Sequence, residues 1–230
     1  MRLLPTEPAE RATASIEPST PAAASSTAAN QPEPKAGPLG ADEYQPVPWS
    51  TLPDHRCFGC SQTNASGLRL RFATRDDGAI ETLFRLDRTF ESYPGIVHGG
   101  LIGVICDETM GNLIVLRTGL TSLTIGMRLR YVNAVRVNAE YRCTARLTDR
   151  SRVAVDAGAG AGGLLRTESE VVDADGTIVA TATATYRPIS MDGARAHLTL
   201  TADAFDRAEA SLTAAVTSPN STQSQEHLHP

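Results

Sequence analysis

Residues 99–117 constrain the fold of this 230-residue chain more than any other segment. Between Leu101 and Leu116, nearly every residue is Leu, Ile, Val, Cys, Met or Gly. A helix that is apolar around its whole circumference is buried on most sides. Asp107 and Glu108 lie in its middle, where an ionised carboxylate is costly unless it is paired or used. The rest of the chain must therefore wrap one helix, and the two carboxylates are candidate functional residues.

Strand-like patterns occur on both sides of this segment, and these strands can form the sheet that covers the helix. The turn Asp76-Asp77-Gly78 joins the first two runs, and Asp173-Ala-Asp-Gly176 joins the last two. Gly119 is the expected C-terminal cap of the helix. A curved antiparallel sheet around one long central helix, an α+β fold, follows from this order. The predicted strands are 68–72, 80–84, 124–132, 139–148, 164–172 and 177–187.

Composition divides the chain into three parts. Residues 1–48 are rich in Ala, Pro, Ser, Thr and Glu, and we expect them to be disordered because they offer little apolar surface. Residues 49–190 have the size of one domain. Residues 191–230 form a C-terminal extension, with helical character at 202–216 and a polar, disordered tail from 218.

Charge and targeting signals exclude several classes of function. The formal charge is −5, but residues 51–189 hold 16 Arg and 15 acidic residues, so the acidity lies in the flanks. This balance argues against nucleic-acid binding, and Lys35, the only lysine, lies outside the domain. We find no secretory signal and no run that approaches membrane-spanning length, so we expect a cytoplasmic protein. The glycines of 158–163 lack the strand–turn–helix context of a nucleotide loop.

The start of the apolar segment carries a second chemical feature, His98-Gly99-Gly100. Free backbone N–H groups at a helix start lie at the positive end of the helix dipole. Asp107 follows about two turns later. An oxyanion donor and a carboxylate on one helix suit acyl-transfer chemistry.

With Thr124, seven residues before Tyr131, these residues resemble the hotdog-fold acyl-CoA thioesterases of the PaaI/THEM group, over 55–188. The resemblance implies a hotdog fold and hydrolysis of acyl-CoA, or of an acyl carrier protein, by a homodimer or homotetramer without a cofactor. The upstream part of the resemblance is Cys57-Phe-Gly-Cys60 with Asn64 and Gly67-Leu68, although Ser61 and Ser66 replace the usual Gly and Pro.

The resemblance also implies roles for single residues. Asp107 would be the general base or the nucleophile, and the N–H of Gly99, with Gly100, would bind the thioester oxygen. His98 would orient the loop, as a turn or cap residue does. Thr124 would come from a partner subunit, and Glu108 would make a polar contact at the dimer interface.

Arg128 and Arg130 alternate with apolar residues, so we predict that both project from the face that carries Thr124. They either contact coenzyme A phosphates or line a solvated face. Cys57 and Cys60 are either a redox pair or half of a zinc site. Because the second pair is missing, we expect no metal.

Two other functions remain open. A hotdog module that binds acyl-CoA without hydrolysis would have no use for a buried carboxylate. A hydratase or dehydratase would need a His–Asp pair in one site, and neither His55 nor His98 follows an Asp at helical spacing.

Overall fold

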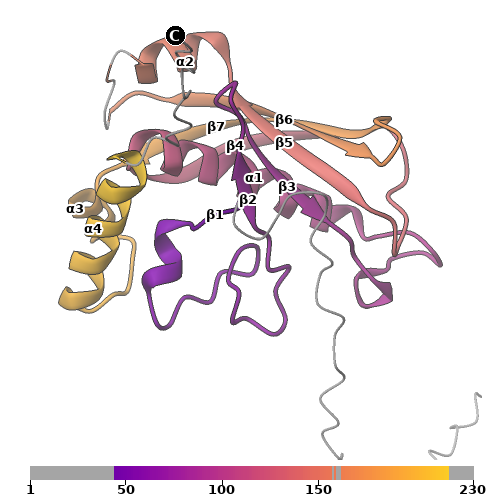
Figure 1. The fold of residues 1–230 in the computed structure, drawn as a ribbon, viewed down its shortest axis with the longest axis horizontal. Coiled ribbons are helices and arrows are strands. Elements are labelled where there is room, and N and C mark those ends of the chain that lie inside the picture. The colour runs from indigo at the N-terminus through magenta and orange to yellow at the C-terminus, as the bar shows by residue number, and fades with distance from the viewer. Residues whose placement is uncertain (1–43, 157, 159–161, 218–230) are drawn as a thin grey trace, which may run out of the picture. The chain divides into compact units, whose positions relative to one another are not determined.

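The structure, a computed structural model, describes residues 44–156, 158 and 162–217. An antiparallel sheet lies against the central helix α1, Gly99–Thr118, with the strand order β1-β2-β3-β5-β6-β7-β4 (Figure 1). This is the α+β hotdog arrangement that the sequence predicts. The strands are β1 Tyr44–Gln45, β2 Phe72–Thr74, β3 Ile80–Phe84, β4 Thr121–Tyr131, β5 Tyr141–Leu147, β6 Leu165–Asp173 and β7 Ile178–Ile189. The other helices are η2 Pro48–Thr51, η3 Arg88–Phe90, α2 Asp149–Asp156, α3 Met191–Ala194 and α4 Ala202–Thr217.

Helix α1 is the centre of the hydrophobic core. Ile105, Met110 and Leu113 are fully buried, and each such side chain stabilises the fold by about 1.5–3 kcal/mol. The helix ends at Gly119, whose φ of 66° is the left-handed cap conformation that was predicted. Its 20 residues and mean hydropathy of 1.4 match a membrane span, contrary to our expectation. Burial of 56% of that window identifies it as a core helix.

The first hairpin differs from its prediction. Strand β2 begins at Phe72, where the predicted strand 68–72 ends. Arg69 has a φ of 53°, which breaks an extended strand. The backbone N–H groups of Leu68 and Leu70 instead donate to the carbonyl oxygens of Phe58 and Gly59, at 2.7 and 2.9 Å. The segment is therefore tied to the loop that contains the two cysteines. Helix α2, between β5 and β6, was not predicted.

The fold is longer at both ends than the expected domain. Strand β1 pairs with β2, and Val47 is buried, so the fold begins before residue 49. Helix α4 confirms the expected helical segment. It packs into a second, smaller hydrophobic core that it shares with the end of α1. That core holds Val115, Met191, Phe205, Ala208 and Leu212. Disorder was expected for residues 1–48 and from 218. Residues 44–48 belong to the fold instead, and residues 1–43 and 218–230 lie outside the described part.

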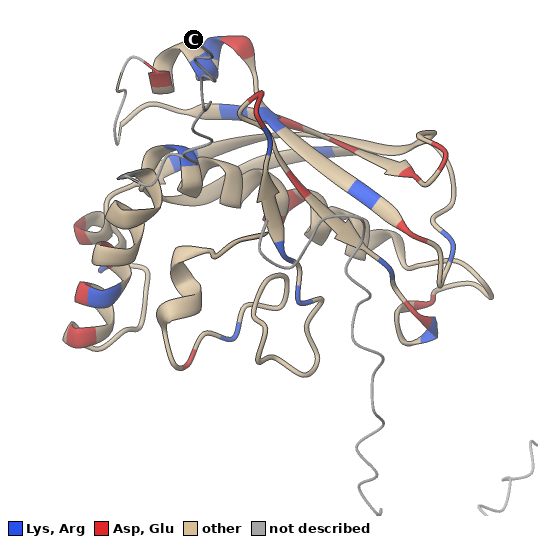
Figure 2. Ribbon diagram, viewed as in Figure 1, with Lys and Arg blue, Asp and Glu red and all other residues tan. Residues whose placement is uncertain are grey.

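Charges of both signs are interspersed over the described residues (Figure 2). Arg146 and Glu168, for example, lie opposite each other on β5 and β6. Cross-strand neighbours of opposite charge stabilise a sheet modestly. The distribution agrees with the near-neutral balance of 51–189.

Candidate active site

Asp107 lies half-buried on α1 and accepts two hydrogen bonds on one carboxylate oxygen. The hydroxyl of Thr124 donates to Oδ1 at 2.8 Å, and the hydroxyl of Tyr186 lies 2.7 Å from the same oxygen. Among the described residues, no hydrogen bond reaches Oδ2. The two donors fix the orientation of the carboxylate and leave one oxygen available to a ligand.

Chain topology brings Thr124 to Asp107. The turn at Gly119 sends β4 back alongside α1, so the two residues meet although they are 17 positions apart. This contact is made within one chain. The expectation that a partner subunit supplies Thr124 is therefore wrong for this contact.

Tyr186 is the site residue that the sequence analysis missed. It lies on β7 directly opposite Thr124 and is 1% exposed. Burial and the neighbouring Asp107 carboxylate raise its pKa far above the ordinary value, so the hydroxyl remains a donor. The sequence did carry a signal, because Ala180, Ala182 and Ala184 precede it on the same buried face. A tyrosine that ends a row of buried alanines has its hydroxyl in the interior and needs a partner there.

A cavity of about 430 Å³ adjoins Asp107, Thr124 and Tyr186. Part of its wall comes from η2 and from residues 197–200, which belong to the C-terminal extension. Trp49, Leu52 and Leu200 make this wall largely apolar. Such a volume with a few convergent polar groups is typical of a small-molecule site.

Glu108 faces away from Asp107, toward the loop that contains the cysteines. Its Oε1 and the Sγ of Cys57 share a hydrogen bond of 3.1 Å, and Asn112 Nδ2 donates to Oε2 at 3.3 Å. These contacts lie within one chain, and the place of Glu108 at a dimer interface stays a prediction. Burial raises the pKa of Glu108 to about 8.

The two cysteines have opposite electrostatic behaviour. The pKa of Cys57 is lowered to about 3, chiefly by the hydrogen bond that the Cys60 thiol donates. The same hydrogen bond and burial raise the pKa of Cys60 well above its ordinary value. Both line the cavity, together with His55. The cavity lining therefore includes a thiol cluster as well as a carboxylate that is hydrogen-bonded by two hydroxyls.

The start of α1 does not lie at this cavity. His98 is the N-cap residue, as expected, and its Nδ1 accepts the N–H of Gly100 at 3.0 Å. The N–H of Gly100 is thus already occupied, which leaves Gly99 as the donor to consider. Eight residues separate Gly99 from Asp107, which corresponds to about 12 Å along a helix.

Arg128 and Arg130 lie on the face of β4 away from α1, which corrects the prediction. The register shifts between Thr124 and Gly126, so Ile125 is an extra residue in the strand. An extra residue reverses the alternation of side chains beyond it. The face toward α1 therefore carries Thr124, then Met127, Leu129 and Tyr131. The two arginines are exposed on the opposite face, away from the cavity.

Comparison with known proteins gives structural likenesses alone. No protein-family model and no curated protein matches the chain. Similar solved structures include a thioesterase superfamily protein, with 19% identity over 54% of this chain and 56% of that one, at a TM-score of 0.46. The structure of a Streptococcus mutans protein bound to acetyl-CoA is 18% identical over 53% of this chain and 89% of that one, at a TM-score of 0.44. The PaaI protein of the E. coli phenylacetic acid degradation operon is 14% identical over 54% of this chain and 81% of that one, also at a TM-score of 0.44. The chain spans just over half the length of the first of these.

Proposed function

We propose that this chain hydrolyses acyl thioesters, with Asp107 as the catalytic carboxylate. The observation that carries the proposal is the geometry of that carboxylate. It lies at the wall of a largely apolar cavity, Thr124 and Tyr186 hold its Oδ1, and Oδ2 faces no protein donor among the described residues. The sequence resemblance to PaaI/THEM-like thioesterases is the second support.

Two routes suit this geometry. As a general base, Asp107 takes a proton from water while the water oxygen attacks the thioester carbon. As a nucleophile, Asp107 attacks the carbon itself and forms an anhydride that water then cleaves. In both routes the C–S bond breaks, the thiolate leaves and takes up a proton, and the products are a free acid and a thiol.

The oxyanion donor must come from a second copy of the chain. A reacting carbonyl needs its donor and its base each within about 3 Å. The N–H of Gly99 lies about two helical turns from Asp107 of the same chain, so one thioester cannot reach both. The proposal therefore pairs Asp107 of one protomer with Gly99 of its partner, in a homodimer or a dimer of dimers.

Strand β4 is the surface that we assign to this dimer. It forms one edge of the sheet, and edge strands carry unpaired N–H and C=O groups that attract another strand. Four large apolar side chains of this strand are exposed by 40–55%: Leu123, Ile125, Met127 and Tyr131. Exposed apolar side chains gathered on an edge strand support the assignment of β4 as the interaction surface.

The test is hydrolysis of an acyl-CoA panel by the wild type and by Asp107→Asn. We expect turnover in the wild type and a loss on the order of 10²-fold or more in the variant, because the amide cannot accept the proton. Chromatographic detection of the acid avoids interference from Cys57 and the other free thiols. Asp149→Asn, at an exposed carboxylate of α2, is the matched control with unchanged activity.

Each other outcome identifies a different function. Wild-type activity in Asp107→Asn would contradict the role of this carboxylate. Tight acyl-CoA binding without turnover in either protein would support a non-catalytic binding module. Turnover of an acyl carrier protein, with none of acyl-CoA, would assign the other thiol carrier.

A further inference from the structure

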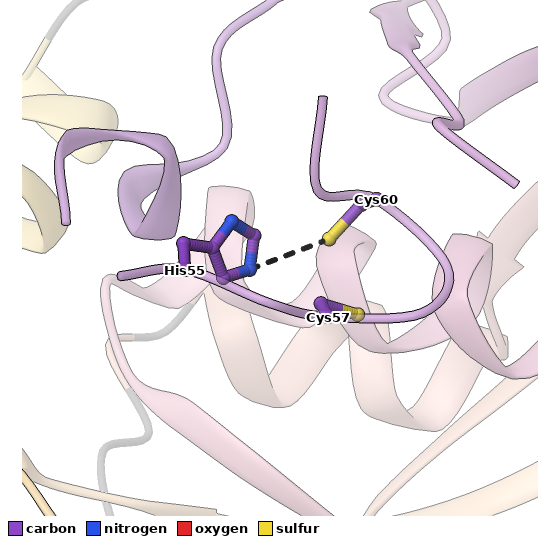
Figure 3. Close-up of side chains that lie close together, drawn as sticks. All are labelled: His55, Cys57 and Cys60. Atoms are coloured by element: carbon purple, nitrogen blue, oxygen red, sulfur yellow. Dashed lines mark hydrogen bonds between the residues drawn. The ribbon is translucent and has the colours of Figure 1, made fainter. Parts of the chain in front are cut away.

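Three potential metal ligands meet in the loop before β2. The side-chain donor atoms of His55, Cys57 and Cys60 all lie within 4.8 Å of one another (Figure 3). The Sγ of Cys60 is 4.0 Å from Nε2 of His55. In a tetrahedral zinc site, sulfur at about 2.3 Å and nitrogen at about 2.0 Å from the metal lie about 3.5 Å apart. Only a small contraction separates the cluster from that geometry.

Glu108 on α1 lies beside the cluster, in contact with Cys57, and a shift of its carboxylate toward His55 and Cys60 would make it the fourth ligand. Its Oε1 is 3.1 Å from the Sγ of Cys57, and two ligands of one tetrahedral zinc ion lie about 3.5 Å apart. We infer that His55, Cys57, Cys60 and Glu108 form a structural zinc site that fastens this loop to α1. Because four protein atoms complete a tetrahedron, the site has no open position and no step of the proposed hydrolysis runs through it.

The loop backbone is arranged to support a thiolate ligand. The N–H of Gly59 donates to the Sγ of Cys57 at 3.3 Å, and the N–H of Ser61 donates to the carbonyl oxygen of Cys57 at 3.2 Å. The Ser61 hydroxyl donates to the carbonyl oxygen of His55 at 2.7 Å. Hydrogen bonds of this kind orient metal ligands and stabilise their charged form.

The loop also fits closely over the fourth ligand. A Cβ at Gly59 would collide with the side chain of Glu108, so only glycine lets the two cysteines approach α1 this closely. The bonds from Leu68 and Leu70 to Phe58 and Gly59 hold the other side of the loop. The three loop donors and their neighbour Glu108 are thus held close to one another by contacts that do not depend on the metal.

The donor set selects the type of ion. Two thiolates and an imidazole favour Zn²⁺ over Mg²⁺ or Ca²⁺, which take oxygen ligands. A redox role would need the two cysteines alone and would leave His55 and Glu108 without a purpose in the cluster. The sequence expectation of no metal depended on a missing second cysteine pair, and the structure supplies an imidazole and a carboxylate in its place.

The experiment measures metal binding to the full chain and is independent of its activity. The chain is stripped with a chelator under reducing conditions and titrated with Zn²⁺ alone and with Co²⁺ alone. We expect one equivalent of Zn²⁺ per chain. For Co²⁺ we expect the visible bands of a tetrahedral ion together with a near-ultraviolet thiolate-to-metal band. The Co²⁺ spectrum of the wild type needs no variant and so does not depend on how well variants fold.

Variants then assign the ligands. Cys57→Ser, Cys60→Ser and His55→Asn are each expected to weaken Zn²⁺ binding at least tenfold, and Glu108→Gln to shift the Co²⁺ bands. The matched controls are Cys143→Ala, at a buried cysteine outside the cluster, and His197→Asn, at an exposed histidine of the same cavity. Both controls are expected to bind like the wild type.

Two results would overturn the inference. One is the absence of stoichiometric Zn²⁺ binding, or binding that Cys57→Ser and Cys60→Ser leave unchanged. The other is ready formation of a Cys57–Cys60 disulfide in the stripped chain that added Zn²⁺ does not prevent, which would identify a redox pair. Neither result bears on thioester hydrolysis, which has its own test at Asp107.

Discussion

At the scale of single residues, the candidate site depends on how one carboxylate is held. Asp107 could be selected from the sequence because an acid in a fully apolar helix is costly unless it is used. Its partners could not be selected in the same way. Thr124 has the ordinary composition of a strand, and its role rested on resemblance. Tyr186 lies 79 positions from Asp107, and only the pairing of β4 with β7 brings it to the site.

Tyr186→Phe tests this support directly. The change removes one donor to Asp107 and keeps the ring. A hydrogen bond to a charged group is worth about 1.5–3 kcal/mol, so we expect kcat to fall by about 10- to 100-fold with KM little changed. Steady-state kinetics on the best thioester of the panel measures both constants.

The control is Tyr141→Phe on β5. Tyr141 is also buried, and its hydroxyl accepts the N–H of Arg136 at 2.8 Å, away from Asp107. An equal loss of kcat in both variants would show that the effect comes from the fold and would contradict a specific role for Tyr186.

At the scale of elements, β4 shows what a sequence pattern can and cannot predict. Alternation and composition identified this strand to within three residues at each end. The extra residue at Ile125 did not interrupt the alternation of apolar residues, and its one signal in the sequence was Gly126, since a glycine inside a strand is typical of a bulge. A single uncounted residue placed Arg128 and Arg130 on the wrong face. Periodicity therefore predicted the element, whereas the identity of its faces needed the backbone.

Ile125→Lys tests the proposed dimer. The wild type is expected to have twice the chain mass of 24.4 kDa in solution, or four times if two dimers associate. A charge on this edge strand opposes pairing, and we expect the dimer dissociation constant to rise by about 30-fold or more, equivalent to about 2 kcal/mol. Sedimentation velocity over a concentration series measures it.

Val153→Lys is the matched control, because Val153 is 66% exposed on α2 and lies outside the β4 edge. Hydrolysis should fall with dissociation in Ile125→Lys, because one site needs Asp107 of one protomer and Gly99 of its partner. A free monomer cannot bring these two residues together. A fully active monomer would contradict the pairing of Gly99 and Asp107 across two chains.

At the scale of the whole molecule, the packing of α4 decides where the fold ends. The helix was predicted from its own composition, but its docking on α1 was not. The contact joins Val115, near the end of α1, to Phe205 and Leu212. These residues are about 100 positions apart in sequence, and no local pattern reports such a contact.

Leu212→Ala measures how firmly α4 is docked. Leu212 is 2% exposed, and removal of a buried leucine side chain typically costs about 2–5 kcal/mol. We expect a decrease of this size in the free energy of unfolding, followed by circular dichroism in urea. Val216→Ala, at a residue 47% exposed on the same helix, should change it by less than about 0.5 kcal/mol. Equal stability of the two variants would mean that α4 contributes little to the fold.

The cavity wall has a consequence for how this protein is divided into parts. Trp49 and residues 197–200 both line the cavity although 148 positions separate residue 49 from residue 197. The unit that can pack a sheet around α1 is thus shorter than the unit that forms this cavity. A chain trimmed to residues 49–190 would keep Asp107, Thr124 and Tyr186 but would lose residues 197–200, and with them part of the wall that covers these groups. Shelter from solvent, more than the chemical groups themselves, is what the two ends of the fold contribute.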